Sequence, residues 1–513
     1  MKQRGQGYSA KHEGAWKILV KPARLAVFLL LLSIAAERAR EGVSAELDAN
    51  DSIETVVAKA ASVRPSERQV QWQEMEFILF AHFGMNTFTN REWGSGKEDP
   101  KFFNPADFDA EQWAKAAKDA GAKMIILTAK HHDGFCLWPS KFTEHSVKNS
   151  PWKNGQGDVV KEVADACRGA GIKFGVYLSP WDRHEKSYGT PAYNDYYKNQ
   201  LRELLTNYGE VSELWMDGAG MGKKFKRMRQ LYDWDGFFRL ARELQPNAVI
   251  AIRGPDVRWV GNEAGKGRQS EWSVLPDKID EPAPDLGSRK RLMEHAGQGQ
   301  ALRWRPAEVD VSIRPGWFYH SREDKLVKST KQLEQIYFSS VGGNAVLLLN
   351  IPPDRRGRFH ENDLARLHEF GGFLREAFRD DLALGASSRA SAVRGNRNEF
   401  SAANTVDNDP ETCWMPDEGI SSASLEYELA RPATFNLAVL QECVREGQRV
   451  EGFYIDVWDG TSWKTIAQAT TIGYKRILRI SEVSAARVRI RFTQSRLCPT
   501  LSNFQLFHIP ETD

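Results

Sequence analysis

Val211-Ser212-Glu213-Leu214-Trp215-Met216-Asp217-Gly218 is an apolar run with the length of a buried strand, and it ends on a carboxylate followed by a glycine. A carboxylate is an unusual residue for a protein core. Barrel enzymes, by contrast, carry their catalytic residues at the carboxyl ends of their strands. We therefore predict that Asp217 is a catalytic nucleophile at the mouth of a barrel.

Short apolar runs alternate with amphipathic helical stretches throughout residues 65–382. This alternation is typical of βα units and a parallel sheet. Three of the helical stretches, 110–120, 158–170 and 194–208, have a glycine at or just beyond their ends, as expected of a helix C-cap. The length of the region suits a (β/α)8 barrel, an α/β fold. The predicted strands are 77–83, 123–130, 173–178, 211–217, 248–253, a weaker one near 269–274, 309–313 and 345–350.

Residues 383–513 have a different pattern, in which strand-sized runs follow one another without helical stretches between them. Asp459-Gly460 lies between two of these runs as a hairpin turn. We predict an all-β sandwich for this C-terminal domain. Its predicted strands are 424–429, 435–444, 450–457, 463–468, 476–480, 487–492 and 504–509.

The N-terminus has the features of an export signal. Basic residues precede an apolar run at 25–36, and Val43-Ser44-Ala45 offers a cleavage site of small residues. The run is short for a helix that must cross about 30 Å of hydrocarbon, so a cleaved signal peptide at 1–45 is favoured over a membrane anchor. Membrane attachment is expected only if the leader is not cleaved. We predict export to a periplasmic, extracellular or lysosome-like compartment, and a linker or capping segment at 46–64.

Charge and cysteine content exclude several classes of protein. The 70 Lys and Arg against 68 Asp and Glu leave a net charge of +2, and no basic cluster is interleaved with aromatic residues, so nucleic acid is not an expected partner. None of the five cysteines forms a CxxC pair that would indicate a zinc or redox site. A disulfide within the C-terminal cluster of cysteines is compatible with export. The oligomeric state does not follow from the sequence.

Polar and aromatic residues gather where the predicted barrel strands end, and these ends meet at one mouth. A metal site is one alternative for His131 and His132, but adjacent residues on a strand point to opposite faces and no further ligands recur at zinc-like spacing. One of the two is then a candidate structural histidine. Carboxylates at the mouth are equally suited to pairing with Arg258 or Arg314. Packing in the core does not explain well why so many histidines, carboxylates and tryptophans occur at the ends of the predicted strands.

Paired carboxylates, histidines and aromatic walls suit glycoside hydrolysis. One carboxylate attacks the sugar or activates water, while the second, in its acid form, protonates the leaving oxygen. Asp217 and Glu263 lie on successive βα loops and are near enough to face one substrate. No P-loop or dinucleotide fingerprint indicates a phosphate site.

The motifs at these strand ends resemble, in order, those of glycoside hydrolase family 29, the α-L-fucosidases. They are HFGMNTF (82–88), EWG (92–94), AKHHDGFCLW (129–138), YLSPWDRHE (177–185), ELWMDG (213–218), GPDVRW (254–259), GNEAG (261–265), EVDVSIRPGWFYH (308–320) and NAVLLLNIPP (344–353). The tail segments 440–458 and 470–480 are also similar to the C-terminal domain of that family. This domain resembles a galactose-binding-like, discoidin-type sandwich, for which packing on the barrel is favoured over sugar binding.

The resemblance implies a retaining mechanism through a covalent fucosyl-enzyme, with no metal or organic cofactor. Asp217 matches the family nucleophile, and Glu263 matches the acid/base of one subgroup. Direct attack requires the two carboxyl groups to lie about 5–5.5 Å apart. The positions that match those around the fucose hydroxyls and ring are His82, Glu92, Trp93, His131, His132 and Tyr177, with Trp317 as a wall for the methyl group.

The GNEAG subgroup is associated with α1,3- and α1,4-linked fucose on branched, Lewis-type glycans, which is the substrate class expected here. Candidate contacts to the outer sugars are Trp181, Asp182, Arg258, Trp259, Glu308 and Asp310, and from the tail Trp414 and Glu426. Two alternatives remain. One is a glycosidase for another sugar of L-galacto configuration, since apolar pockets reject an added hydroxyl weakly. The other is a non-catalytic fucose-binding lectin, which would have no need for both Asp217 and Glu263.

Overall fold

The computed structural model describes residues 41–218, 230–277 and 285–509 of the 513-residue chain. Most of the predicted signal segment therefore lies outside the described residues. Its last residue, Ala45, begins the short strand β1 (Ala45–Glu46), and helix α2 (Ile53–Ser62) follows within the predicted linker or capping segment. No helix of the described ranges is long and apolar enough to cross a membrane.

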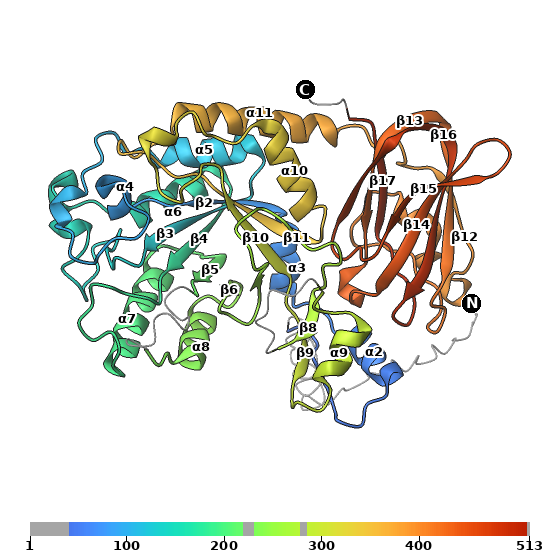
Figure 1. Ribbon diagram of the computed structural model, residues 1–513, viewed down its shortest axis with the longest axis horizontal. Helices are drawn as coiled ribbons and strands as arrows, with labels where there is room; N and C mark the ends of the chain where they lie inside the picture. The colour runs from blue at the N-terminus through green and yellow to red at the C-terminus, as the bar shows by residue number, and fades with distance from the viewer. Residues whose placement is uncertain (1–40, 219–229, 278–284, 510–513) are drawn as a thin grey trace, which may run out of the picture. The chain divides into compact units, whose positions relative to one another are not determined.

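Eight parallel strands form a nearly closed barrel (Figure 1), in the order β6-β5-β4-β3-β2-β11-β10-β7. An isolated parallel bridge between Ala251 and Val257 joins the two ends of this order. The predicted barrel is thus confirmed. Its strands are β2 (Phe77–Ala81), β3 (Met124–Lys130), β4 (Lys173–Leu178), β5 (Glu213–Met216), β6 (Val249–Ile252), β7 (Arg258–Trp259), β10 (Ala307–Ser312) and β11 (Ala345–Asn350).

Alternation along each strand separates two apolar layers. In β5, Leu214 and Met216 belong to the layer between the sheet and the helices, whereas Trp215 packs inside the barrel with Phe80 and Tyr177. Glu213, Trp215 and Asp217 therefore share the inner side of the barrel. This alternation places Asp217 at the mouth, one residue beyond the end of the strand.

Helices cover the outside of the barrel (Figure 1). Asp109, Asp158 and Asp233 cap the N-termini of three of them through side-chain hydrogen bonds, and Gly121 and Gly171 end two of them with a positive φ. The predicted helices 110–120, 158–170 and 194–208 are confirmed within two residues. The main helices are α5 (Ala110–Ala120), α6 (Val159–Ala170), α7 (Ala192–Asn207), α8 (Trp234–Leu244), α10 (Thr330–Ser340) and α11 (Glu361–Ala377).

The prediction of a sixth barrel strand near 269–274 is wrong. The barrel uses β7 instead, which has two residues and follows β6 after a turn rather than a helix. Val274–Pro276 forms β8 of a separate three-stranded antiparallel sheet with β9 (Ala301–Trp304) and β1. The apolar run near 274 is explained by this small sheet, whose core includes Val274, Trp304 and residues of α2.

The C-terminal domain is an antiparallel β structure, as predicted. Two pairs of predicted strands are each one long strand: 424–429 with 435–444, and 476–480 with 487–492. In the first of these long strands, the pairing register shifts between Glu428 and Ala433. The residues at this irregularity lack the alternation of a regular strand, so the sequence pattern predicted a loop there. The strands are β12 (Ser387–Ala390), β13 (Ala423–Gln441), β14 (Val450–Trp458), β15 (Trp463–Ala469), β16 (Arg476–Ser495) and β17 (Asn503–Phe507).

Side chains of the C-terminal domain bond to the loop that precedes β8. Gln448 accepts a hydrogen bond from the Ser273 backbone N–H (2.7 Å) and donates one to the Glu271 carbonyl (2.9 Å).

All five cysteines have free thiols.

Candidate active site

All nine residues predicted for the site line one pocket of about 100 Å³ at the mouth of the barrel. The sequence did not single out Phe80 and Trp215, which also line it. Each lies two residues before a predicted site residue, His82 or Asp217, on the same side of a strand, and this spacing could have identified them. The pocket is lined by Phe80, His82, Glu92, Trp93, His131, His132, Tyr177, Trp215, Asp217, Glu263, Asp310 and Trp317.

Asp217 is held in place by a hydrogen bond from Tyr177. The Tyr177 hydroxyl donates a hydrogen bond to Asp217 Oδ2 (2.9 Å), and His132 Nε2 lies 3.6 Å from the same oxygen. Burial, followed by the charge of Asp217, raises the pKa of Tyr177 well above its usual value, so the hydroxyl remains a donor. The Asp217 side chain is 22% exposed, which leaves it accessible from the pocket.

His131 and His132 both line the pocket, so the expectation that they face opposite sides is wrong. The register of β3 shifts between Thr128 and Lys130, and the two histidines follow the end of the strand. Their ring centroids are 4.0 Å apart. The alternation of a regular strand therefore does not apply to them.

Hydrogen bonds fix which nitrogen of each histidine is protonated. Ser179 Oγ donates to the Trp181 carbonyl (2.6 Å), so it must accept from Nδ1 of His132 (2.8 Å). His132 Nε2 is then an acceptor, because burial lowers the pKa of this ring to about 4. His131 Nδ1 accepts from the amide of Asn86 (3.4 Å), which makes its Nε2–H a donor.

His82 is fixed in the same way by the end of β11. The Asn350 amide donates to the Ser312 hydroxyl and to the Trp317 carbonyl, so its oxygen accepts from His82 Nδ1 (2.8 Å). Burial lowers the pKa of His82 to about 3. The three neutral rings thus offer two acceptors and one donor, a set that matches sugar hydroxyls.

Glu92 is anchored by the loop that follows β10. The backbone N–H of Trp317 donates to Oε2 (2.9 Å), and the N–H of Phe318 and His320 Nε2 lie 3.3 and 2.7 Å from Oε1. This carboxylate joins the loops after β2 and β10 and still faces the pocket.

Glu263 and Asp310 are the other two carboxyl groups of the pocket. Glu263 is exposed at the rim and accepts a hydrogen bond from the indole of Trp317 (3.2 Å). Asp310 is buried and accepts one from the indole of Trp259 (2.8 Å). Burial raises the pKa of Asp310 well above its usual value, so the acid form of this group is favoured relative to an exposed aspartate.

Beneath the pocket, Glu213 and Glu308 form a buried carboxyl pair. The indole of Trp72 donates to Glu213 Oε2 (2.7 Å) and the indole of Trp215 to Glu308 Oε1 (2.8 Å), while the remaining oxygen of each has no donor. Burial raises the pKa of Glu213 to about 7, and burial with the charge of Glu213 also raises the pKa of Glu308 well above its usual value. We infer that the two carboxyl groups share one proton.

Replacement of Glu308 by Gln is expected to reduce the pH dependence of stability. The folded pair binds a proton more tightly than the unfolded chain, so the wild type loses stability as pH rises from about 4.5 to above 7. The amide N–H of a glutamine can donate a hydrogen bond to Glu213 without binding a titratable proton. Urea unfolding at pH 5 and at pH 8 gives the free energy of unfolding at each pH. The decrease between the two values should be smaller in Glu308→Gln than in the wild type, by on the order of 2 kcal/mol. Equal losses in both proteins would contradict the shared proton.

Several candidates for contact with outer sugars are buried away from the mouth. Asp182 is fully buried in an ion pair with Lys130 (2.9 Å), Arg258 pairs with Glu271, and Glu308 belongs to the carboxyl pair. In the tail, Trp414 lies in the core of the C-terminal domain, and Glu426 pairs with Arg389. The predictions for Asp182, Arg258, Glu308 and Trp414 are wrong because these residues are buried by partners elsewhere in the chain, whereas Glu426, whose side chain is 27% exposed, stays a prediction. Trp259, which is 39% exposed, and Asp310 remain near the pocket.

No cluster of three or more His, Cys, Asp or Glu side chains suited to a metal ion occurs within residues 41–218, 230–277 and 285–509. The pocket itself offers carboxyl, imidazole and phenol groups.

Comparison with known proteins identifies the family of the chain. The family model described as alpha-L-fucosidase matches residues 71–377, and an F5/8 type C domain matches residues 385–502. "Alpha-L-fucosidase 1" of Arabidopsis thaliana is 42% identical over 450 residues, which cover 86% of this chain and 87% of that protein.

Solved structures are similar over most of the chain. A putative alpha-L-fucosidase of Bacteroides ovatus is 48% identical, with a TM-score of 0.82 over 92% of this chain and 78% of that one. A GH29 fucosidase of Ruminococcus gnavus, determined in complex with fucose, is 34% identical, with a TM-score of 0.78 over 91% and 99% of the two chains. This chain belongs to the alpha-L-fucosidase family, glycoside hydrolase family 29.

Proposed function

We propose that this protein is a retaining, exo-acting α-L-fucosidase that releases terminal α1,3- or α1,4-linked fucose from Lewis-type glycans. The observation that carries the proposal is Asp217, held by Tyr177 at the end of β5 in a pocket it shares with Glu263. The pocket of about 100 Å³ suits a single terminal sugar. His82, His131 and His132 would bind its hydroxyl groups.

The two carboxyl groups have separate roles in this mechanism. Asp217 attacks the anomeric carbon while Glu263, in its acid form, protonates the departing glycosidic oxygen. The aglycone leaves as an alcohol and the fucose remains attached to Asp217 as an ester. Glu263, now a carboxylate, accepts a proton from water, whose oxygen displaces Asp217 and restores the α configuration.

Support for the linkage preference comes from the position of Glu263. It lies on the loop after β7, in the GNEAG segment that is similar to the α1,3/1,4 subgroup. Asp310 lines the same pocket as Glu263 and is bonded to the partly exposed Trp259, so the two offer a buried acid and an aromatic ring to neighbouring sugars. The alternatives are an enzyme for another L-galacto sugar and a lectin with the same pocket.

The test is fucose release from Lewis-type trisaccharides, an α1,2-fucosyl disaccharide, 4-nitrophenyl α-L-fucoside and the corresponding α-L-galactoside. NMR at early times should show α-fucose first, as double displacement requires. Faster release from the trisaccharides supports the linkage preference. Initial β-fucose excludes the retaining mechanism, faster hydrolysis of the galactoside supports the first alternative, and binding without turnover supports the lectin.

We also propose that residues 1–45 direct export, that 65–382 form the catalytic domain and that 383–513 pack on it. Mass spectrometry of the protein recovered outside the cytoplasm would give its N-terminus. An intact Met1 in that protein would contradict cleavage.

A further inference from the structure

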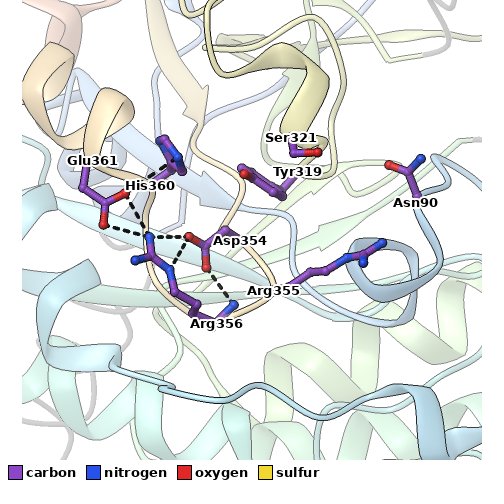
Figure 2. Close-up of a pocket in the computed structure, with 8 residues that line it drawn as sticks. All are labelled: Asn90, Tyr319, Ser321, Asp354, Arg355, Arg356, His360 and Glu361. Carbon is purple, nitrogen blue, oxygen red and sulfur yellow. Dashed lines mark hydrogen bonds and ion pairs between the residues drawn. The ribbon is translucent and has the colours of Figure 1, made fainter.

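Figure 2 shows a second pocket, of about 470 Å³, formed by loops at the carboxyl ends of barrel strands. Three loops form it: Asn90 follows α4 (Met85–Thr89), Tyr319 and Ser321 follow β10, and residues 354–361 join β11 to α11. Strands β2, β11 and β10 are neighbours in the barrel. The size is within the range of pockets that bind small ligands, about 300–1,000 Å³.

One side of this pocket is filled by ion pairs. Arg356 donates to Asp354 (2.6 and 2.9 Å) and to Glu361 (3.0 Å), and His360 Nε2 lies 3.7 Å from Glu361. Figure 2 shows these side chains gathered together. Their two carboxylates already have cationic partners, so this side does not require a ligand.

The other side of the pocket has hydrogen-bond donors that a ligand could use. Arg355 is exposed and extends away from the ion pairs toward Asn90 (Figure 2). Its Nε donates to the Thr87 carbonyl (3.2 Å), which fixes the side chain, and no carboxylate among the described residues pairs with its guanidinium. Ser321 adds an exposed hydroxyl. This arrangement favours an anionic oxygen group.

A chain of hydrogen bonds connects the two pockets. Asn90 Oδ1 lies 2.6 Å from His320 Nδ1, and Nε2 of the same ring lies 2.7 Å from Glu92 in the catalytic pocket. His320 is 2% exposed, so this connection is shielded from solvent. Because its oxygen is engaged, Asn90 has its amide N–H groups available for a ligand.

We propose that the pocket around Arg355 binds the acidic group, a carboxylate or a sulfate ester, of a saccharide. The guanidinium binds the acid oxygens in a bidentate manner, and Asn90 and Ser321 donate to the adjoining oxygens. The larger volume accommodates a whole sugar unit beside the fucose pocket. The physiological ligand rests on the proposed function, as an acidic part of a fucosylated glycan, but binding at Arg355 does not require turnover.

NMR titration of the full-length protein tests the proposal with saccharides that lack fucose. The probes are a hexuronic acid, a hexose 6-sulfate and the neutral hexose as a control. We expect binding of an acidic probe that weakens about tenfold or more in Arg355→Ala. Arg355→Lys should retain part of the affinity, because it keeps the charge but loses the fork. Comparison of the two acidic probes identifies which acid is bound.

Arg322→Ala is the matched control, since this exposed arginine lies near the pocket but does not line it. Its affinity for the acidic probe should equal that of the wild type. Fucose should not compete with the probe, and Arg355→Ala should release fucose from neutral glycans at the wild-type rate. Equal binding of the neutral hexose, equal affinity in Arg355→Ala or no acidic binding overturns the proposal. Loss of fucose release in the wild type would instead overturn the proposed function alone.

Discussion

Asp217→Gly and Asp217→Ala are expected to lower kcat by about 10⁴-fold or more, because the proposed mechanism forms the fucosyl ester on Asp217. The fold should be retained. Asp217 lies one residue beyond β5, is partly exposed, and its loss removes one hydrogen bond from Tyr177. Circular dichroism and the thermal unfolding midpoint should therefore be close to those of the wild type. Full activity in either variant would exclude the role of nucleophile.

Azide distinguishes a lost nucleophile from a damaged pocket. In Asp217→Gly, the space left by the carboxylate admits azide, which attacks the anomeric carbon of 4-nitrophenyl α-L-fucoside. The expected product is β-L-fucosyl azide, formed with one inversion at that carbon. Tyr177→Phe is the matched control, since it removes the donor to Asp217 but leaves the nucleophile. Azide should not accelerate this variant.

Seven of the eight barrel strands could be located from the sequence, because strands buried on both faces are continuous apolar runs. β7 could not, since two residues, Arg258 and Trp259, carry no periodic pattern. The apolar run near 274 was a true strand signal, but hydrophobicity does not tell which sheet a strand joins. Only the pairing of β8 with β9 decides that.

The site could be predicted from position, because carboxyl ends of parallel strands converge at one mouth. The sequence did not predict the interactions between residues that are distant in the chain. Lys130 and Asp182 lie 52 positions apart, and their fully buried ion pair gives no local signal. Trp215 has the pattern of an ordinary core aromatic, and only its spacing from Asp217 indicated the pocket, which it lines while it stacks on Tyr177 at 5.1 Å between ring centroids.

Glu263→Ala is expected to separate natural from activated substrates. General acid catalysis contributes about 10²–10⁴-fold when the leaving group is a sugar alcohol. The variant should therefore lose about that factor in kcat/KM for a Lewis-type trisaccharide. The 4-nitrophenolate group leaves without a proton, so kcat/KM for the aryl fucoside should change little. The comparison uses, for each substrate, the ratio of kcat/KM in the variant to kcat/KM in the wild type. A low activity of the wild type on the aryl fucoside therefore does not affect the comparison.

Asp310→Asn tests the rival acid in the same pocket. Burial raises the pKa of Asp310, but this group is buried and held by Trp259, whereas Glu263 is exposed and accepts from Trp317. Asparagine keeps an acceptor for Trp259, so this variant should lose the same factor on both substrates. If the selective loss on the trisaccharide occurs in Asp310→Asn and not in Glu263→Ala, then Asp310 is the acid and the role of Glu263 is wrong.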